Sequence, residues 1–372
     1  MKFAVCSNNA VFNQNRLQDP NWCRRFPGSG WVSYVYQHAK ENNIQITSGD
    51  LAIDLVSSGE WRADEIFVIS EMNARDARIL VQLGAKPFIV SCFEAPLYAP
   101  IFYDNLERHL KNYRYKWVFG LNKAQMDQAE SKELISIKFP SYFFDDLQNI
   151  ENWESRKCMA LVAENKYKTP KMFLPTIFSI KILLRYCKYC LLRLSSPSYA
   201  YSIKNSLHDR RLELIEHFMK KGKLDLYGSG WNDLSNLPKK LGSRLSSLMK
   251  GRYFGRCENK LVTLGQYQFS ICFENMALKG YMTEKIIDCF VAGTIPIYLG
   301  DPLIQTELPR DSFIDTRDFE SLDELDEHIQ SISKDRAIKM IESGRAYLQS
   351  PKGSLHSYEG FAKNVIKLAQ QW

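Results

Sequence analysis

The sequence predicts an α/β fold with two doubly wound, Rossmann-like domains that face each other across a cleft. Short apolar runs alternate with helical patterns along the chain, which is typical of β/α units around a parallel sheet. The 372 residues are enough for two domains that each bury a core. Pro140 and the acidic, polar run over 145–154 divide the alternating pattern into two blocks.

The first block predicts an N-terminal Rossmann-like domain over 1–150. Its expected strands cover 3–6, 44–47, 66–70, 88–92 and 117–120, with helices at 32–40 and 73–83. The second block predicts a domain over 151–350 with strands at 158–163, 224–228, 268–273 and 295–299. Its helices are expected at 209–221, 283–292, 321–333 and 335–349, and residues 351–372 are expected to form a separate helical tail.

Composition narrows the function classes. Hydrophobic content of 45% with 24% charged residues is that of a globular protein, and no window resembles a transmembrane helix. A net charge of +7 fits anionic substrates, anionic lipid or nucleic acid, but no nucleic-acid-binding motif is present, so no nucleic-acid partner is expected. The nine cysteines have no regular spacing, which favours reduced thiols in a cytoplasmic protein.

An insertion at 165–204 interrupts the second block. It contains no acidic residue and interleaves lysines and arginines with large apolar residues. Within 177–194 the charges recur every three to five residues, so a helix would carry a basic stripe beside an apolar one. Two interpretations remain open: a helix on an anionic membrane surface, and a helix packed on its own domain with a solvated basic face.

The segment 269–288 is the most informative. It predicts a buried strand ending in Phe273-Glu274-Asn275, a polar loop, and a helix opening at Thr283-Glu284-Lys285. A helix start offers free backbone N–H groups and a positive dipole end, both favourable to an anion. Lys285 adds a charge, and Glu284 an acceptor for sugar hydroxyls. The segment therefore suits a nucleotide diphosphate that carries a sugar.

Sugar transfer from such a donor needs a base for the acceptor hydroxyl and a neutraliser for the departing diphosphate. The chain has no Asp-x-Asp motif, and neither its histidines nor the lone Cys-x-x-Cys at 187–190 has metal-site spacing, so no metal or cofactor is expected. Lys285 and Arg211, at two helix starts, are the candidate cations. Glu94 is the candidate base, because it ends an apolar strand before a proline and is expected to be partly desolvated.

Four further residues are candidates for donor binding. Tyr281 could present a flat face and a hydroxyl to the sugar or nucleotide. Asn275 can both donate to and accept from a hexose hydroxyl. Glu274 could contact the donor or instead hold the loop together. Lys260, upstream of the signature, could bind the donor or be a surface lysine.

The signature Phe273-Glu274-Asn275, a spacer, and Tyr281-Met-Thr-Glu-Lys285 resembles that of the α-1,3/4-fucosyltransferases, glycosyltransferase family 10. The resemblance extends over 209–319 and is local around Glu94, where Ala95 replaces a family serine. It implies a GT-B fold in which the domain over 1–150 binds the acceptor and the domain over 151–350 binds GDP-fucose. It also implies Glu94 as general base, Arg211 as a grip on the diphosphate, and a counterpart of Lys260. It further implies inverting transfer of L-fucose from GDP-β-L-fucose to a glycan, at the 3-OH of N-acetylglucosamine in an acceptor such as a lipopolysaccharide O-antigen.

Animal members of this family carry an N-terminal membrane anchor, and no such anchor is expected in this protein. A bacterial-type, cytoplasmic enzyme is therefore expected, peripheral on the inner face of the membrane if 165–204 binds lipid. Two alternatives stay open. One is a GT-B transferase that uses another nucleotide deoxysugar. The other is a non-catalytic peripheral membrane protein that binds GDP or glycan.

Overall fold

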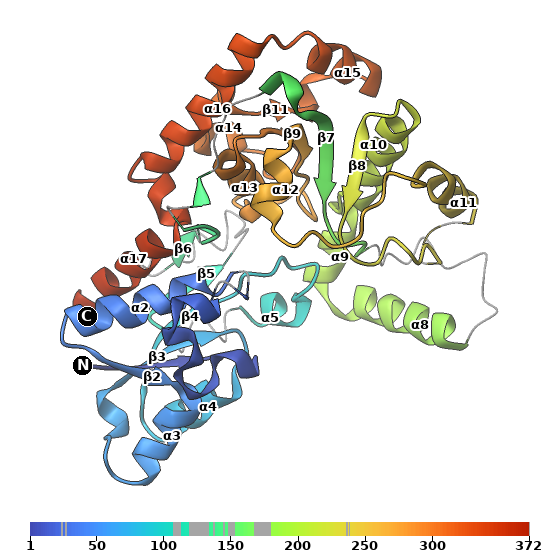
Figure 1. Cartoon of the computed structure of the whole chain (residues 1–372). Coiled ribbons are helices and arrows are strands. Elements are labelled where there is room, and N and C mark those ends of the chain that lie inside the picture. The colour runs from blue at the N-terminus through green and yellow to red at the C-terminus, as the bar shows by residue number, and fades with distance from the viewer. Residues whose placement is uncertain are drawn as a thin grey trace. The chain divides into compact units, whose positions relative to one another are not determined.

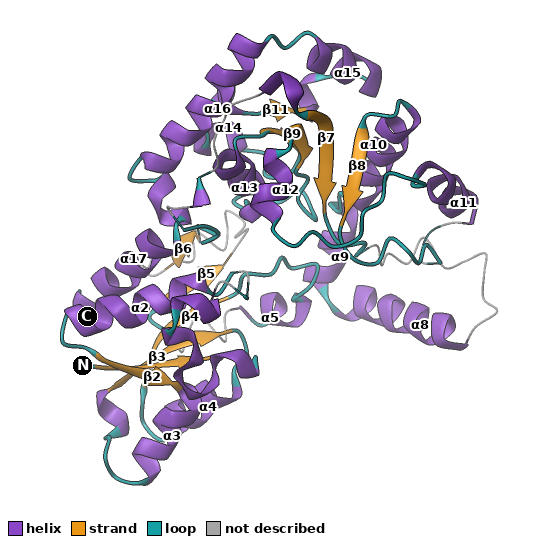
Figure 2. Cartoon of the chain, in the orientation of Figure 1, coloured by secondary structure: helices purple, strands orange, loops and turns teal. Residues whose placement is uncertain are grey.

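The computed structural model describes residues 1–23, 25–26, 28–106, 113–118, 134–136, 138–143, 146–147, 153–166, 180–235, 237 and 239–371. The chain divides into two compact units. The first unit combines Met1–Phe144 with Ser350–Trp372, and the second is Asp145–Gln349. Each unit has its own parallel sheet with helices beside it (Figures 1 and 2).

The sheet of the first unit has the order β2-β1-β3-β4-β5-β6, and all its neighbouring strands are parallel. The strands are β1 (Lys2–Cys6), β2 (Gln45–Ser48), β3 (Ile66–Glu71), β4 (Lys86–Ser91), β5 (Tyr115–Val118) and β6 (Leu134–Ser136). The five predicted strands are confirmed, although residues 119–120 of the last lie outside the described part. The sequence did not predict β6.

The helices of the first unit are α1 (Pro20–Cys23), α2 (Gly30–Glu41), α3 (Gly49–Ser57), α4 (Arg75–Gln82), α5 (Pro100–Asp104) and α17 (Tyr358–Gln370). The predictions of α2 and α4 are confirmed. Residues 351–372, expected as a separate tail, instead belong to this unit. The reason is the apolar face of α17, which packs on α2 with the rings of Phe361 and Trp31 5.3 Å apart (Figure 1).

The sheet of the second unit has the order β11-β10-β9-β7-β8 and is also parallel. Its strands are β7 (Lys157–Val162), β8 (Leu224–Tyr227), β9 (Tyr267–Ile271), β10 (Ile295–Tyr298) and β11 (Ile314–Asp315), which confirms the four predicted ones. The chain adds β8 on one side of β7 and then returns to add β9 on the other side. This reversal is a topological switch point, where ligands of doubly wound sheets bind at the carboxyl ends of the strands.

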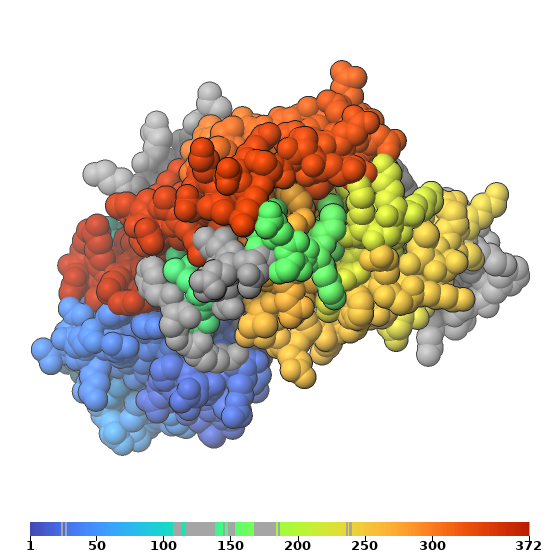
Figure 3. Space-filling view, turned by 45° about the horizontal axis from the view of Figure 1, so that its top comes forward, coloured from blue at the N-terminus to red at the C-terminus, as the bar shows by residue number. Residues whose placement is uncertain are grey.

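The second unit contains α8 (Ile180–Ser195), α9 (Pro197–Lys204), α10 (His208–Lys220), α11 (Lys239–Leu248), α12 (Lys260–Gly265), α13 (Glu284–Ala292), α14 (Ile304–Glu307), α15 (Leu322–Gln330) and α16 (Lys334–Gln349). The four predicted helices correspond to α10, α13, α15 and α16. Side chains of α15 and α16, orange to red in Figure 3, lie together over one face of this unit. The helices α11, α12 and α14 were not predicted.

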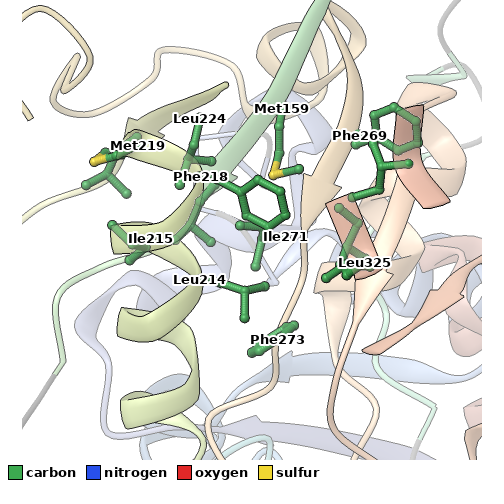
Figure 4. Close-up of a cluster of buried hydrophobic side chains, with 14 of the residues drawn as sticks. Met159, Leu214, Ile215, Phe218, Met219, Leu224, Phe269, Ile271, Phe273 and Leu325 are labelled. Atoms are coloured by element: carbon green, nitrogen blue, oxygen red, sulfur yellow. The ribbon is translucent and has the colours of Figure 1, made fainter. Parts of the chain in front are cut away.

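The core of the second unit fixes the position of α10. Leu214, Ile215 and Phe218 recur at helical spacing and lie between α10 and the strands β7 and β9, against Met159 and Ile271 (Figure 4). Phe218 and Ile215 are completely buried. Burial of a side chain of this size typically contributes about 1.5–3 kcal/mol, so this cluster holds α10 against the sheet.

The basic insertion forms α8 and α9, which pack on each other. Lys168, Lys171 and the side chains of Lys181 and Arg185 lie outside the described residues. Three leucines of α8 are strongly exposed: Leu184 at 64%, Leu191 at 65% and Leu194 at 86%. Among the described residues, no helix has the length and apolar character needed to span a membrane.

Candidate active site

The predicted signature lies at the carboxyl end of β9, which is next to β7 at the switch point. The strand ends at Ile271, and α13 begins at Glu284 with Thr283 as its N-cap. The signature therefore lies where ligands bind in doubly wound sheets.

Glu274 is an internal anion at the start of α13. Its side chain is 0% exposed and accepts hydrogen bonds from the Thr283 backbone N–H at 2.8 Å and the Thr283 hydroxyl at 2.8 Å. Its Oε2 also lies 3.0 Å from Nζ of Lys285. The structure thus differs from the expectation of a free N–H at Thr283, because Glu274 already satisfies it. These contacts agree with the alternative in which Glu274 holds the loop together.

Lys285 and Glu284 are both charged at neutral pH. Burial alone would lower the pKa of Lys285, but Glu274 and Glu284 raise it above its usual value. Burial alone would raise the pKa of Glu284, but Lys285 and Lys260 lower it to about 2. Glu284 is 32% exposed and lies 3.5 Å from Lys285, so it is the more accessible and more loosely held of the two partners of Lys285.

Lys260 is the first residue of α12 and forms an ion pair with Asp288 of α13, with Nζ 2.6 Å from Oδ2. Lys260 and Lys285 line the same small cavity, of about 10 Å³, together with the ends of β7 and β9. The structure therefore brings these two predicted cations together. Asp288 was missed; its only signal was an acidic residue within the apolar run Ile286–Phe290.

Arg211 is 4% exposed and holds the loop after β9. Its Nη2 donates to the carbonyl oxygens of Phe273 at 2.7 Å and Glu274 at 3.0 Å, and to Oδ1 of Asn275 at 3.4 Å. Asn275 in turn donates to the Tyr281 hydroxyl at 3.4 Å. The ring of Tyr281, expected to offer a flat face, is buried. Arg211, Asn275 and Tyr281 thus form a hydrogen-bond network around the loop that follows β9.

Further hydrogen bonds tether the loop 275–283 along its length. The Asn275 carbonyl accepts from the Leu207 N–H at 3.1 Å, and the Ala277 N–H donates to the Asn205 carbonyl at 2.7 Å. The Gly280 N–H donates to Oδ2 of Asp301 at 2.9 Å. Asp301 is buried and was not predicted as a site residue.

Glu94 belongs to the first unit and is exposed, whereas the sequence predicted partial desolvation. The difference arises because β4 ends at Ser91, so Glu94 lies in the turn beyond the strand. Its backbone carbonyl accepts from the Tyr103 hydroxyl at 3.1 Å. Glu71, which ends β3 beside the switch point of this sheet, was missed. It accepts a hydrogen bond from Ser7, and burial raises its pKa.

His208, the first residue of α10, makes stability dependent on pH. Burial, with a smaller effect of Arg211, lowers its pKa from 6.5 to about 3. Below about pH 6.5 the unfolded chain binds a proton that the folded state refuses until about pH 3, so the free energy of unfolding falls as pH falls through this window. When the pH is lowered from 7 to 5, the free energy of unfolding should fall in both proteins. We expect the fall to be about 1–2 kcal/mol smaller for His208→Gln than for wild type, as measured by urea unfolding. Equal losses would contradict this.

Residues 198–340 match the family model described as glycosyltransferase family 10 (fucosyltransferase) C-term. Residues 198–340 are a glycosyltransferase family 10 domain. The family 10 domain contains Arg211, Asn275 and Lys285, and the resemblance inferred over 209–319 is confirmed. Within the described residues, no group of three or more His, Cys, Asp or Glu side chains could hold a metal ion.

Two curated relatives align with part of the chain. The α-(1,3)-fucosyltransferase FucT of Helicobacter pylori is 44% identical over 73 residues, which is 20% of this chain and 15% of the relative. The 4-galactosyl-N-acetylglucosaminide 3-α-L-fucosyltransferase 9 of Mus musculus is 34% identical over 93 residues, 24% of this chain and 26% of the relative. The aligned part thus spans about a quarter or less of the length of these relatives.

Solved structures show the fold of the whole chain. A crystal structure of an α1,3-fucosyltransferase has a TM-score of 0.51 at 17% identity and covers all of this chain and 89% of its own. Anabaena HepE in complex with UDP and glucose has a TM-score of 0.55 at 8% identity and covers both chains completely. These likenesses over the whole chain confirm the predicted GT-B fold.

Proposed function

We propose that the protein is an inverting fucosyltransferase that transfers L-fucose from GDP-β-L-fucose to a hydroxyl group of a glycan. The observation that carries the proposal is the family 10 fucosyltransferase domain over 198–340, with Lys260 and Lys285 together at its switch point. The acceptor proposed is the 3-OH of an N-acetylglucosamine unit, in a glycan such as a lipopolysaccharide O-antigen.

In the proposed reaction, the Glu94 carboxylate takes the proton of the acceptor hydroxyl. The acceptor oxygen bonds to the anomeric carbon of fucose from the face opposite GDP. The bond from that carbon to the phosphate oxygen breaks, and GDP leaves with the electron pair. Lys285 and Lys260 would balance the negative charge that grows on the diphosphate, without a metal ion.

The charges of the site favour one rearrangement on donor binding. Lys285 lies between Glu274 and Glu284, and Lys260 is paired with Asp288. Glu274 is completely buried, whereas Glu284 is partly exposed. We therefore propose that Glu284 turns from Lys285 to sugar or ribose hydroxyls, while Glu274 stays and Arg211 keeps the loop in place.

The proposal is tested by transfer from GDP-fucose to a panel of lactosamine-type acceptors, with product mass and linkage determined. Competing nucleotide deoxysugars are included as donors. Turnover of GDP-fucose alone, with an α-linked product, is expected. Preferential turnover of another donor would favour the related transferase. Wild-type protein that binds GDP and transfers nothing would favour a non-catalytic binding module.

We also propose that the protein binds an anionic membrane surface through α8. Leu184, Leu191 and Leu194 recur at spacings of seven and three, so they share one side of the helix. All three are strongly exposed, so the packing of α8 on α9 leaves this apolar side of the helix uncovered. The exposed cations Lys188 and Arg193, with no acidic residue in α8, suit anionic lipid headgroups.

Charge reversal on α8 tests this membrane contact. We expect Lys188→Glu with Arg193→Glu to lower the partition onto phosphatidylserine vesicles by about 10²-fold or more in sedimentation, because each cation near such a surface contributes about 1 kcal/mol. Lys250→Glu with Lys339→Glu makes the same change in net charge at exposed positions outside α8. Equal binding of both double variants would show that α8 is not the contact.

A further inference from the structure

Asp288 is a carboxylate in an apolar part of α13. It is 5% exposed, and the neighbouring side chains Ile286, Ile287, Cys289 and Phe290 are also buried. A buried carboxylate is costly unless a cation and hydrogen bonds compensate for the lost water. Lys260 supplies the cation at 2.6 Å. The position of Asp288 therefore depends on Lys260, and the position of the Lys260 ammonium depends on Asp288.

The pair joins two helices that meet at the switch point. Lys260 is the first residue of the short helix α12, which packs on α13. The cavity that Lys260 and Lys285 share is also lined by Val162 and Ala163 at the end of β7 and by Phe273 after β9. Asp288 thus holds the Lys260 ammonium at the same strand ends where Lys285 lies.

The charged groups around Asp288 come from these two helices. Lys260 belongs to α12, while Glu284 and Lys285 belong to α13. Burial raises the pKa of Asp288 to about 6, against the opposing effect of Lys260. For Lys260, burial alone would lower the pKa, but Asp288 and Glu284 raise it above its usual value. At pH 7.5 the pair is therefore ionised.

We infer that Asp288 is a positioning residue that directs Lys260 toward the diphosphate of the donor, so that two ammonium groups meet the anion. The inference rests on the proposed function for the identity of that anion. It assigns Asp288 no contact with the donor, since Asp288 acts through Lys260. A competing role is purely structural, in which the ion pair only ties α12 to α13.

Asp326 provides a matched control. It is a buried aspartate of the same unit, on α15, 2.9 Å from Nζ of Lys221 and also paired with Lys223. Its removal breaks a buried Asp–Lys pair outside the residues that line the shared cavity. A loss of stability alone should therefore appear in Asp326→Asn as well as in Asp288→Asn.

The experiment is calorimetric binding of GDP to the full chain at pH 7.5. We expect Asp288→Asn to raise the Kd about 10-fold, the effect of one misplaced charged contact. Asp326→Asn should leave the Kd unchanged, and Asp288→Glu, which keeps the charge, should restore most of the affinity. Unchanged GDP binding by Asp288→Asn would overturn the inference.

A double-mutant cycle separates positioning from other effects. Lys260→Met should also weaken GDP binding, and the addition of Asp288→Asn should then change the Kd no further. An equal further loss in the Lys260→Met background would overturn the inference. If Asp288→Asn fails to fold, unchanged GDP binding by Lys260→Met alone would overturn it. Wild-type protein that does not bind GDP would contradict the proposed function as well, whereas wild-type binding with an unaffected Asp288→Asn contradicts this inference alone.

Discussion

Glu94→Gln is expected to lower kcat for fucosyl transfer by about 10²–10⁴-fold and to leave GDP binding unchanged. Gln has nearly the shape of Glu but cannot take the proton of the acceptor hydroxyl. Glu94 lies in the turn after β4 of the first unit, whereas the network of Glu274, Lys285 and Lys260 is in the second unit. Donor binding should therefore not depend on it. Initial rates at saturating donor and acceptor, with GDP calorimetry, measure both quantities.

Two further variants test whether the loss of kcat is specific to Glu94. Glu60→Gln removes an exposed carboxylate of the same unit and should retain activity. Glu71→Gln tests a rival base, because Glu71 ends β3 and burial raises its pKa. Near-normal kcat in Glu94→Gln together with a large loss in Glu71→Gln would move the role of base to Glu71.

Lys285→Met is expected to lower kcat/KM by about 10²–10³-fold, since it removes the cation that we propose faces the departing diphosphate. It should also lower the free energy of unfolding by about 3–5 kcal/mol, because it leaves the Glu274 carboxylate buried without its cation. Lys285→Arg, which keeps the charge, should lose less of both. Rates are measured with GDP-fucose, and stability is measured by urea unfolding.

A second change separates the two effects of Lys285. Adding Glu274→Gln to Lys285→Met removes the uncompensated buried charge, so much of the lost stability should return. The transfer rate should stay low, because the cation is still missing. Recovery of both stability and kcat/KM in the double variant would mean that Lys285 serves only to neutralise Glu274.

Local patterns predicted most regular elements of the two sheets. Runs such as 66–70 and 295–299 are strongly apolar and bounded by polar residues, so their strands were found within a few positions of β3 and β10. The helices α12 and α14 were missed, since with six and four residues each has less than two turns of pattern. The ten-residue α11 was missed as well. The attachment of α17 to α2 was also missed, because a contact between residues so far apart leaves no local signal.

The sequence identified candidate residues of the site, but it did not predict how their side chains contact one another. The motif around 269–288 identified Lys285 and Glu284, and the helix pattern identified Arg211. Sequence could not show that Glu274 points inward or that the Arg211 guanidinium lies on backbone carbonyls. Such facts depend on which way a side chain turns once the core has formed. The pairing of Asp288 with Lys260 could not be predicted for the same reason.

The tethers of loop 275–283 bear on the rate at which a ligand could bind. Its backbone is held at Asn275, Ala277 and Gly280, and Glu274 fixes its last residue, Thr283. A loop that is already ordered loses little conformational entropy on binding, so preorganisation leaves more of the contact energy as affinity. Within this loop, binding would then need only side-chain rotation at Glu284, on the nanosecond scale. The encounter with the nucleotide would be limited by diffusion and orientation.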